Sequence, residues 1–127
     1  MKTFKKSEAI RYFEQKLTYT AGPAEVDRLR REEDIGIVDV RRPEDFHREH
    51  IPHAVNLPRE EWDTLVGLDK GRLNVVYCYT QQCHLAAKAC LTFARKGYRV
   101  MELEGGWKAW KAYGLDVEGE EAGQKAA

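Results

Sequence analysis

Short apolar segments alternate with segments of helical periodicity along most of this chain. "IGIVDV" (residues 35–40) and "NVVYC" (74–78) are β-branched and almost wholly apolar, which is typical of strands covered on both faces. "HAVNLP" (53–58) and "YRVMELE" (98–104) are two further short strand candidates. Because neighbouring parallel strands need crossover connections, the alternation predicts an α/β domain with a mainly parallel sheet and helices on both faces.

Six segments are expected to be helical, five because apolar residues recur three or four positions apart and one, 43–50, as a short helical turn opened by Pro43. They are residues 7–17, 23–33, 43–50, 59–68, 84–96 and 107–113. The first segment puts Ile10, Phe13 and Leu17 on one face. We expect that face to cover part of the core or to form a dimer contact, since an apolar helical stripe needs a partner. Gly97 should end the fifth helix in the left-handed conformation that glycine adopts cheaply.

Length and charge limit the class of protein. The 127 residues correspond to one domain, which we divide into a helical extension (1–20), a folded domain (21–118) and a flexible polar tail (119–127). The 21 Lys and Arg residues balance 21 Asp and Glu residues, so no strong field favours nucleic acid or a membrane surface. The chain has no apolar run of membrane-spanning length and no secretory h-region, which favours a cytoplasmic protein with reduced cysteines.

Reactive side chains follow two of the expected strands. Asp39 and Arg41 come at the end of one, and Cys78 closes the other. In α/β sheets, sites form at the carboxyl ends of strands. A loop that turns from a strand into a helix aims main-chain N–H groups at its centre, which would lower the pKa of Cys78 and present its sulfur outward. The same position also suits a buried core cysteine, and the local pattern leaves both interpretations open.

Two long segments carry a resemblance to a known family. "IVDVRRPEDFHREHIPHAVNLP" (37–58) resembles the D-V-R-x-x-x-E-F-x-x-G-H-I-P-G-A-x-N-x-P segment of rhodanese-like domains. "VVYCYTQQCHLAAKACLTFARKGYRVMELEGGWKAWKAYGL" (75–115) resembles their catalytic half, including the final G-G-x-x-x-W. The resemblance implies a five-stranded, mostly parallel sheet and sulfur transfer through a persulfide on Cys78. It implies a sulfane-sulfur donor such as thiosulfate or polysulfide, a thiol or protein acceptor, and no cofactor. Asp39 and Arg41 are carried over as supporting residues.

The predicted active-site loop departs from the family pattern. It consists of Cys78, Tyr79, Thr80, Gln81, Gln82, Cys83 and His84 and contains no arginine. Arginine binds oxyanions through a permanently charged fork, so its absence predicts weak thiosulfate binding and argues against phosphatase action. His84 can replace part of the missing charge or simply cap the helix. Cys83 can attack a persulfide on Cys78 or point into the packing.

Three functions follow as hypotheses. The first is a sulfurtransferase using Cys78, and the second is a catalytically weak or inactive binding and regulatory module. The third is a thiol redox sensor built from Cys78 and Cys83. We expect Cys90 to be buried and inert, and we expect no metal site because C-x-x-x-x-C-H lacks a second ligand pair at zinc spacing. The chain is expected to be a monomer or a homodimer.

Overall fold

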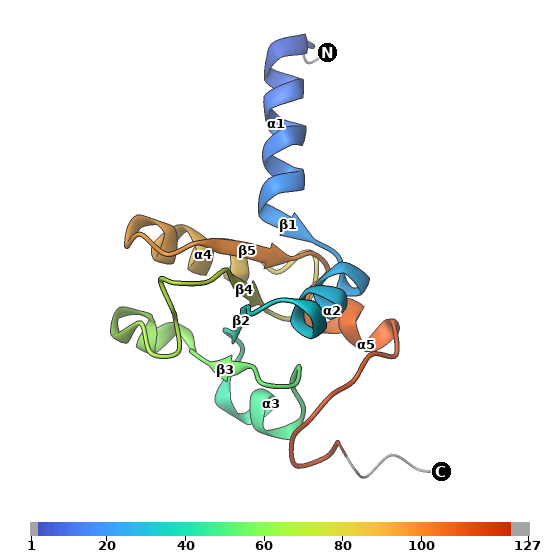
Figure 1. The fold of residues 1–127 in the computed structure, drawn as a ribbon, viewed down its shortest axis with the longest axis vertical. Helices are drawn as coiled ribbons and strands as arrows, with labels where there is room; N and C mark the ends of the chain where they lie inside the picture. Colours follow the sequence, from blue (N-terminus) through green and yellow to red (C-terminus); the bar gives the residue numbers. More distant parts are fainter. Residues whose placement is uncertain (1–2, 123–127) are drawn as a thin grey trace.

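The computed structural model describes residues 3–122 and contains one sheet of five parallel strands (Figure 1). The strands are β1 (Thr20–Ala21), β2 (Gly36–Asp39), β3 (Val55–Asn56), β4 (Asn74–Tyr77) and β5 (Val100–Leu103). Their order across the sheet is β1-β5-β4-β2-β3, so β4 is the central strand. The predicted α/β class and the mostly parallel five-stranded sheet are both confirmed.

The helices confirm most of the predicted segments. They are α1 (Lys6–Tyr19), α2 (Pro23–Glu32), α3 (Pro43–Arg48), the 3-10 helix η1 (Arg59–Thr64), α4 (Leu85–Arg95) and α5 (Gly106–Ala112). Pro23 and Pro43 open α2 and α3, where the missing N–H of proline has no intrahelical partner to lose. Gly97 follows α4 with a φ of 89°, as predicted for a glycine that ends a helix.

The two faces of the sheet bury separate apolar clusters. On one face, Val75 and Tyr77 pack with Val26 of α2 and Trp110 of α5. On the other face, residues of β2 and β4 pack with α4 and η1; the cluster includes Val38, Val76, Cys78, Ala89 and Phe93. Because side chains alternate along a strand, the Cys78 side chain lies on the α4 face while that of its neighbour Tyr77 lies on the α5 face.

Helix α1 projects from the body of the domain (Figure 1). It contains no buried residue, and the side chains of Ile10, Phe13 and Leu17 are 49%, 57% and 79% exposed. The expectation that this helix covers the core is therefore wrong. An amphipathic pattern shows that a helix has an apolar face, but it does not identify what that face contacts.

The C-terminal segment returns to α3. Glu118 exchanges main-chain hydrogen bonds of 2.8 and 2.9 Å with His50. The N–H groups of Glu120 and Glu121 donate to the carbonyls of His47 and Arg48, both at 2.9 Å. Part of the predicted tail is thus tied to the domain, and residues 123–127 of that tail lie outside the described residues.

Candidate functional site

The loop from Cys78 to His84 leaves the carboxyl end of β4 and enters α4. Because β4 lies between β5 and β2, the loop emerges near the middle of the sheet rather than at an edge. This is the position where parallel α/β sheets place their sites. The structure therefore brings the whole predicted loop to the expected end of the sheet.

Helix α5 fixes the orientation of the first two loop peptides. The Trp107 N–H donates to the Cys78 carbonyl at 2.8 Å, and the Lys108 N–H donates to the Tyr79 carbonyl at 2.9 Å. In a trans peptide the N–H points opposite to the C=O. The N–H groups of Tyr79 and Thr80 are therefore turned away from α5, toward the interior of the loop.

Gly106 permits this close approach of α5. Its φ is +60°, and a Cβ at this position would lie 2.8 Å from the Cys78 carbonyl oxygen and 3.0 Å from the Thr80 nitrogen. Real Cβ atoms do not approach main-chain atoms so closely, so only glycine fits without a shift of the backbone. In the sequence, the doubled glycine at 105–106 was expected to form the turn before the last helix, but its close approach to the loop was missed. Adjacent glycines between a strand and a helix were the available signal.

Cys78 is the inner of two contacting thiols. The residue is 2% exposed, and its sulfur lies 3.3 Å from the Cys83 carbonyl oxygen. Burial, followed by a hydrogen bond to the Cys83 thiol, raises the pKa of Cys78 to about 11, although the main-chain amides of Ala86 and Tyr79 act in the opposite direction. The expectation of an outward-facing Cys78 with a lowered pKa is therefore wrong, because its side chain belongs to the α4-side core.

Cys83 is the outer thiol and is partly exposed. Burial alone would raise its pKa, but the hydrogen bond from the Cys78 thiol lowers it. Three main-chain amides also lower it, those of Leu85, Tyr79 and Thr80. The net pKa of Cys83 lies below its ordinary value. The ring of amides that sequence analysis predicted around the loop is thus present, but it favours a negative charge on Cys83 rather than on Cys78.

A buried ionic network lies beneath the loop on the α5 face. The Arg41 guanidinium donates to the Asp39 carboxylate over 2.8–3.1 Å and to the Glu49 carbonyl at 2.6 Å. The Tyr77 hydroxyl donates to Asp39 at 2.5 Å. The guanidinium also lies 4.4 Å from the centre of the Trp107 ring, so the network supports the residue whose N–H holds the loop. Tyr77 was missed in the sequence; the signal was a hydroxyl in an otherwise apolar strand.

Glu44 and His50 follow Arg41 in the chain but make their hydrogen bonds and ion pairs with other residues. Glu44 does not join the network and pairs with Arg42 at 2.9 Å on the surface. His50 donates from Nδ1 to the Phe46 carbonyl at 2.6 Å, and its ring stacks on the Phe46 ring with 3.8 Å between ring centres. Arg41 is 2% exposed and is held by Asp39 and the Glu49 carbonyl, so it does not replace the arginine that the loop lacks.

The remaining loop residues form its rim. The Tyr79 hydroxyl donates to Asp45 at 2.5 Å and accepts from the Arg42 N–H at 3.1 Å. Gln81 and Gln82 are exposed. His84 is exposed at the start of α4, where its side chain makes no capping hydrogen bond. His84 is thus the solvent-facing N-cap residue of α4 without a side-chain capping bond, and its imidazole is open to solvent beside the loop.

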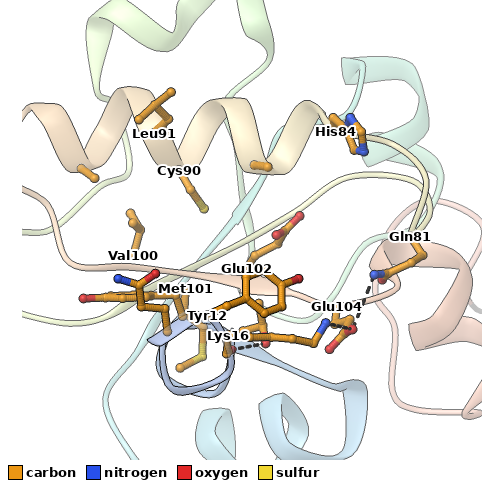
Figure 2. Close-up of a pocket in the computed structure, with 15 residues that line it drawn as sticks. Tyr12, Lys16, Gln81, His84, Cys90, Leu91, Val100, Met101, Glu102 and Glu104 are labelled. Atoms are coloured by element: carbon orange, nitrogen blue, oxygen red, sulfur yellow. Dashed lines mark hydrogen bonds and ion pairs between the residues drawn. The ribbon is translucent and has the colours of Figure 1, made fainter. Parts of the chain in front are cut away.

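A cavity of about 680 Å³ adjoins this rim between α1, α4 and β5 (Figure 2). Gln81 and His84 line it, and the Gln81 side-chain amide donates at 3.5 Å to Glu104, which is also paired with Lys16 at 3.0 Å (Figure 2). Cys90 points from α4 into the cavity in Figure 2. Burial first, and then the charge of Glu102, raises the pKa of Cys90 to about 12. This suits the expected unreactive thiol, although the residue is only partly buried.

Within residues 3–122, no cluster of three or more His, Cys, Asp or Glu side chains is arranged to hold a metal ion. All three cysteines are free thiols. Over the same residues, no helix combines the length and apolarity needed to cross a membrane.

Comparison with known proteins now decides the family. The model of the rhodanese-like domain matches residues 22–113. The chain belongs to the rhodanese-like domain family. The match spans β2 to β5 together with the loop and the Asp39–Arg41 network, and it leaves out α1. The predicted family is therefore confirmed.

Relatives of this rhodanese-like chain differ in their names. A sulfurtransferase of Allochromatium vinosum is 34% identical over 71% of the chain and 84% of that protein. An HTH-type transcriptional regulator of Mycobacterium tuberculosis is 36% identical over 75% of the chain and 42% of that protein. The chain spans 42% and 54% of the length of the first two curated relatives, the regulator and an uncharacterized protein of Synechocystis.

Solved structures share the fold. A protein of Bacillus halodurans superposes with a TM-score of 0.81 and 34% identity, covering 96% of this chain and 92% of that one. The rhodanese-like domain of an Anabaena protein superposes with a TM-score of 0.74 and 27% identity over 85% of this chain and 84% of that one. The Bacillus halodurans match extends over nearly the whole chain and therefore includes most of α1.

Proposed function

We propose that this rhodanese-like chain is a sulfurtransferase whose Cys78–His84 loop carries sulfane sulfur as a cysteine persulfide. The observation that carries the proposal is the set of main-chain amides turned onto two contacting thiols at the end of the central strand. Amides arranged in this way stabilise an anionic sulfur. Cys78 is the predicted carrier because it has the position of the family's catalytic cysteine.

The donor is a small sulfane-sulfur compound such as thiosulfate or polysulfide, and the acceptor is a thiol of a small molecule or a protein. Loop residues 78–84 supply no permanent positive charge, and Arg41 is held by Asp39 and Glu49. A doubly charged donor is therefore bound by neutral hydrogen bonds and by His84 when protonated. We expect thiosulfate to bind loosely and to load the loop only at high concentration.

Intact mass spectrometry tests the proposal. The protein is incubated with thiosulfate or polysulfide, alkylated, and digested to localise the added sulfur. We expect a loop cysteine of the wild type to take up sulfur, seen either as a retained persulfide or as hydrosulfide released once the second loop thiol displaces it. A Cys78→Ser/Cys83→Ser double variant should show neither. Cys90→Ala is the matched control and should load like the wild type, because Cys90 lies outside the loop. If no protein gains sulfur from any donor, sulfur transfer is rejected.

A second candidate is a binding role without sulfur transfer, in which α1 assembles two copies of the chain. Its exposed apolar groove is lined by Phe4, Ile10, Phe13 and Leu17, with Lys6 and Glu14 beside them. Lys6 and Glu14 are equally spaced about Ile10. In an antiparallel pair of helices crossing there, Lys6 of each copy faces Glu14 of the other, as a two-fold interface requires. The similarity to part of a transcriptional regulator also favours a regulatory role.

Sedimentation of the full chain tests this assembly. A dimer that Phe13→Glu converts to a monomer supports it, whereas Arg11→Glu, at an exposed position outside the groove, should leave the dimer intact. A wild-type monomer at all protein concentrations rejects it. Loss of the dimer in both variants would also reject the groove as the interface.

A third candidate, the thiol redox sensor, is favoured by the contact between two free thiols. Mild peroxide, without a sulfur donor, should then form a Cys78–Cys83 disulfide. Thiol counting under non-reducing conditions measures the loss of two thiols. Three free thiols after peroxide treatment would exclude the sensor without affecting the sulfurtransferase proposal.

A further inference from the structure

The two loop thiols differ in access and in surroundings. Cys83 is partly exposed and packs at the edge of the α4-side cluster, whereas Cys78 is 2% exposed and is a buried member of that cluster. Main-chain amides on both sides of the loop face the Cys83 sulfur, from Tyr79 and Thr80 before it and Leu85 after it. Any donor that enters from solvent meets Cys83 first.

The surroundings of the two thiols give them different protonation states. Cys78 retains its proton because burial raises its pKa to about 11, and the Cys78 thiol donates to the Cys83 main-chain carbonyl at 3.3 Å. The Cys78 side chain and three main-chain amides lower the pKa of Cys83. The outer thiol is thus the better thiolate and the inner thiol is a proton donor. Reactivity in sulfur exchange follows thiolate fraction and access.

We infer that Cys83 takes the sulfane sulfur from the donor and that Cys78 then displaces it as hydrosulfide, leaving a Cys78–Cys83 disulfide. This inference rests on the proposed sulfur transfer and adds a second activity to it, the reductive release of sulfide. It also reverses the predicted roles of the two cysteines. The family position of Cys78 remains occupied by a cysteine, but its role becomes that of the resolving thiol.

Each step balances. In the first, the Cys83 thiolate attacks the outer sulfur of thiosulfate; its S–S bond breaks, sulfite leaves, and Cys83 carries a persulfide anion. In the second, the sulfur of Cys78 attacks the inner sulfur of that persulfide. A new Cys78–Cys83 bond forms, the persulfide S–S bond breaks, and the Cys78 proton leaves with the sulfur as HS⁻. The sulfane sulfur is reduced by two electrons and the two thiols are oxidised to the disulfide.

The cycle needs a reductant to return to the starting state. A dithiol, small or carried by a protein, reduces the disulfide by two exchange steps and is itself oxidised to a disulfide. The partly exposed Cys83 is the sulfur that such a dithiol can attack first, which leaves Cys78 as the departing thiol. The rim residues Gln81 and Gln82 are exposed and do not close this approach.

The experiment uses the full chain with thiosulfate and no added thiol, and it measures hydrosulfide release, intact mass and free thiols. The wild type should release hydrosulfide in an amount equal to the protein, lose two thiols, and retain no added sulfur. Cys78→Ser should hold a persulfide on Cys83 and release no hydrosulfide. Cys83→Ser should load at least about tenfold more slowly than the wild type, because the remaining Cys78 thiol is only 2% exposed and its burial raises its pKa, which lowers both its access and its thiolate fraction. Cys90→Ala should behave as the wild type.

Polysulfide serves as a second donor and is scored by mass and thiol count alone. Equal loading of Cys83→Ser and wild type, with the sulfur on Cys78, overturns the inference and leaves the proposed sulfurtransferase standing. A wild type that keeps its persulfide on Cys83 while Cys78 and Cys90 remain free thiols overturns the displacement step. Absence of sulfur in every protein with both donors rejects the proposed function itself. Cys78→Ala replaces Cys78→Ser if serine in the core prevents folding.

Discussion

Replacing Arg41 by alanine should destabilise the protein far more than the same change at the adjacent Arg42. Arg41 is 2% exposed and its partner Asp39 is fully buried. Their ion pair closes to 2.8 Å, and the guanidinium also lies over the Trp107 ring. Arg42 pairs with Glu44 at 2.9 Å, but both side chains are mostly exposed. The two residues are chain neighbours of the same type, so burial is the main difference between them.

Arg41→Ala and Arg42→Ala should differ clearly in how much they lower the free energy of unfolding. Truncating one member of a buried ion pair leaves the other charge unpaired and typically reduces the free energy of unfolding by about 3–5 kcal/mol. Tyr77 still donates to Asp39 in the Arg41→Ala variant, which places the expected loss toward the lower end of that range. An exposed pair such as Arg42–Glu44 contributes roughly 0–1 kcal/mol. Arg41→Lys keeps the charge but loses the forked geometry, so its effect should fall between these values.

Urea unfolding followed by tryptophan fluorescence measures the difference. With a slope of about 1–3 kcal/mol per molar urea for a domain of this size, Arg41→Ala should lower the midpoint by roughly 2 M and Arg42→Ala by a few tenths of that. Equal midpoints for the two alanine variants would refute the assignment of Arg41 to a buried supporting network. If Arg41→Ala does not fold, the midpoint of Arg41→Lys relative to Arg42→Ala makes the same comparison.

Two further predictions concern the loop, and a third concerns Cys90 of α4. Gly106→Ala should speed alkylation of Cys78 because the added Cβ would meet the loop backbone. It should also lower the free energy of unfolding by more than the roughly 1 kcal/mol expected for a left-handed glycine. Gly114→Ala is the control, since Gly114 has a φ of 68° and nothing within 4 Å of a Cβ at that position. Iodoacetamide mapping against pH should label Cys83 first, at a pH below that of an unfolded cysteine, while labelling of Cys78 keeps rising toward pH 11; labelling of Cys78 before Cys83 would contradict the assigned pKa directions. The pKa of Cys90 is raised to about 12 in the folded protein, so the contribution of this thiol to stability is complete below about pH 8.5 and is lost as the pH rises from there. In urea titrations at increasing alkaline pH, the wild type should therefore lose stability relative to Cys90→Ala. Parallel pH dependences for the two proteins would contradict the raised pKa.

Local patterns predicted the parts of the fold that local chemistry determines. The apolar runs at 35–40 and 74–78 became β2 and β4 because continuous β-branched residues suit a strand buried on both faces. Strand β1 was missed, since Thr20 and Ala21 carry no pattern and are a strand only through their pairing with β5. Helix α1 was found, but its surroundings were predicted wrongly because they depend on tertiary and quaternary contacts.

In the site, too, the position of a residue in the sequence could be used for prediction, whereas properties that depend on packing could not. The order of residues placed Cys78 at the end of a central strand and identified Asp39 and Arg41 beside it. The protonation of Cys78 was predicted wrongly because it depends on which way the Cys83 side chain turns and on how deeply β4 is buried. Both are properties of packing. A second cysteine five residues after the first was the available sequence signal that the negative charge could reside elsewhere in the loop.

The hydrogen bonds from α5 to the loop have a consequence for the diversity of such proteins. Trp107 and Lys108 hold the carbonyls of Cys78 and Tyr79, so a distant helix, rather than the central loop residues, sets the direction of the amides. Gln81 and Gln82 take no part in these two bonds. Their side chains can be exchanged to retune donor preference while the amide frame stays fixed, which makes this pair the natural place to engineer new chemistry.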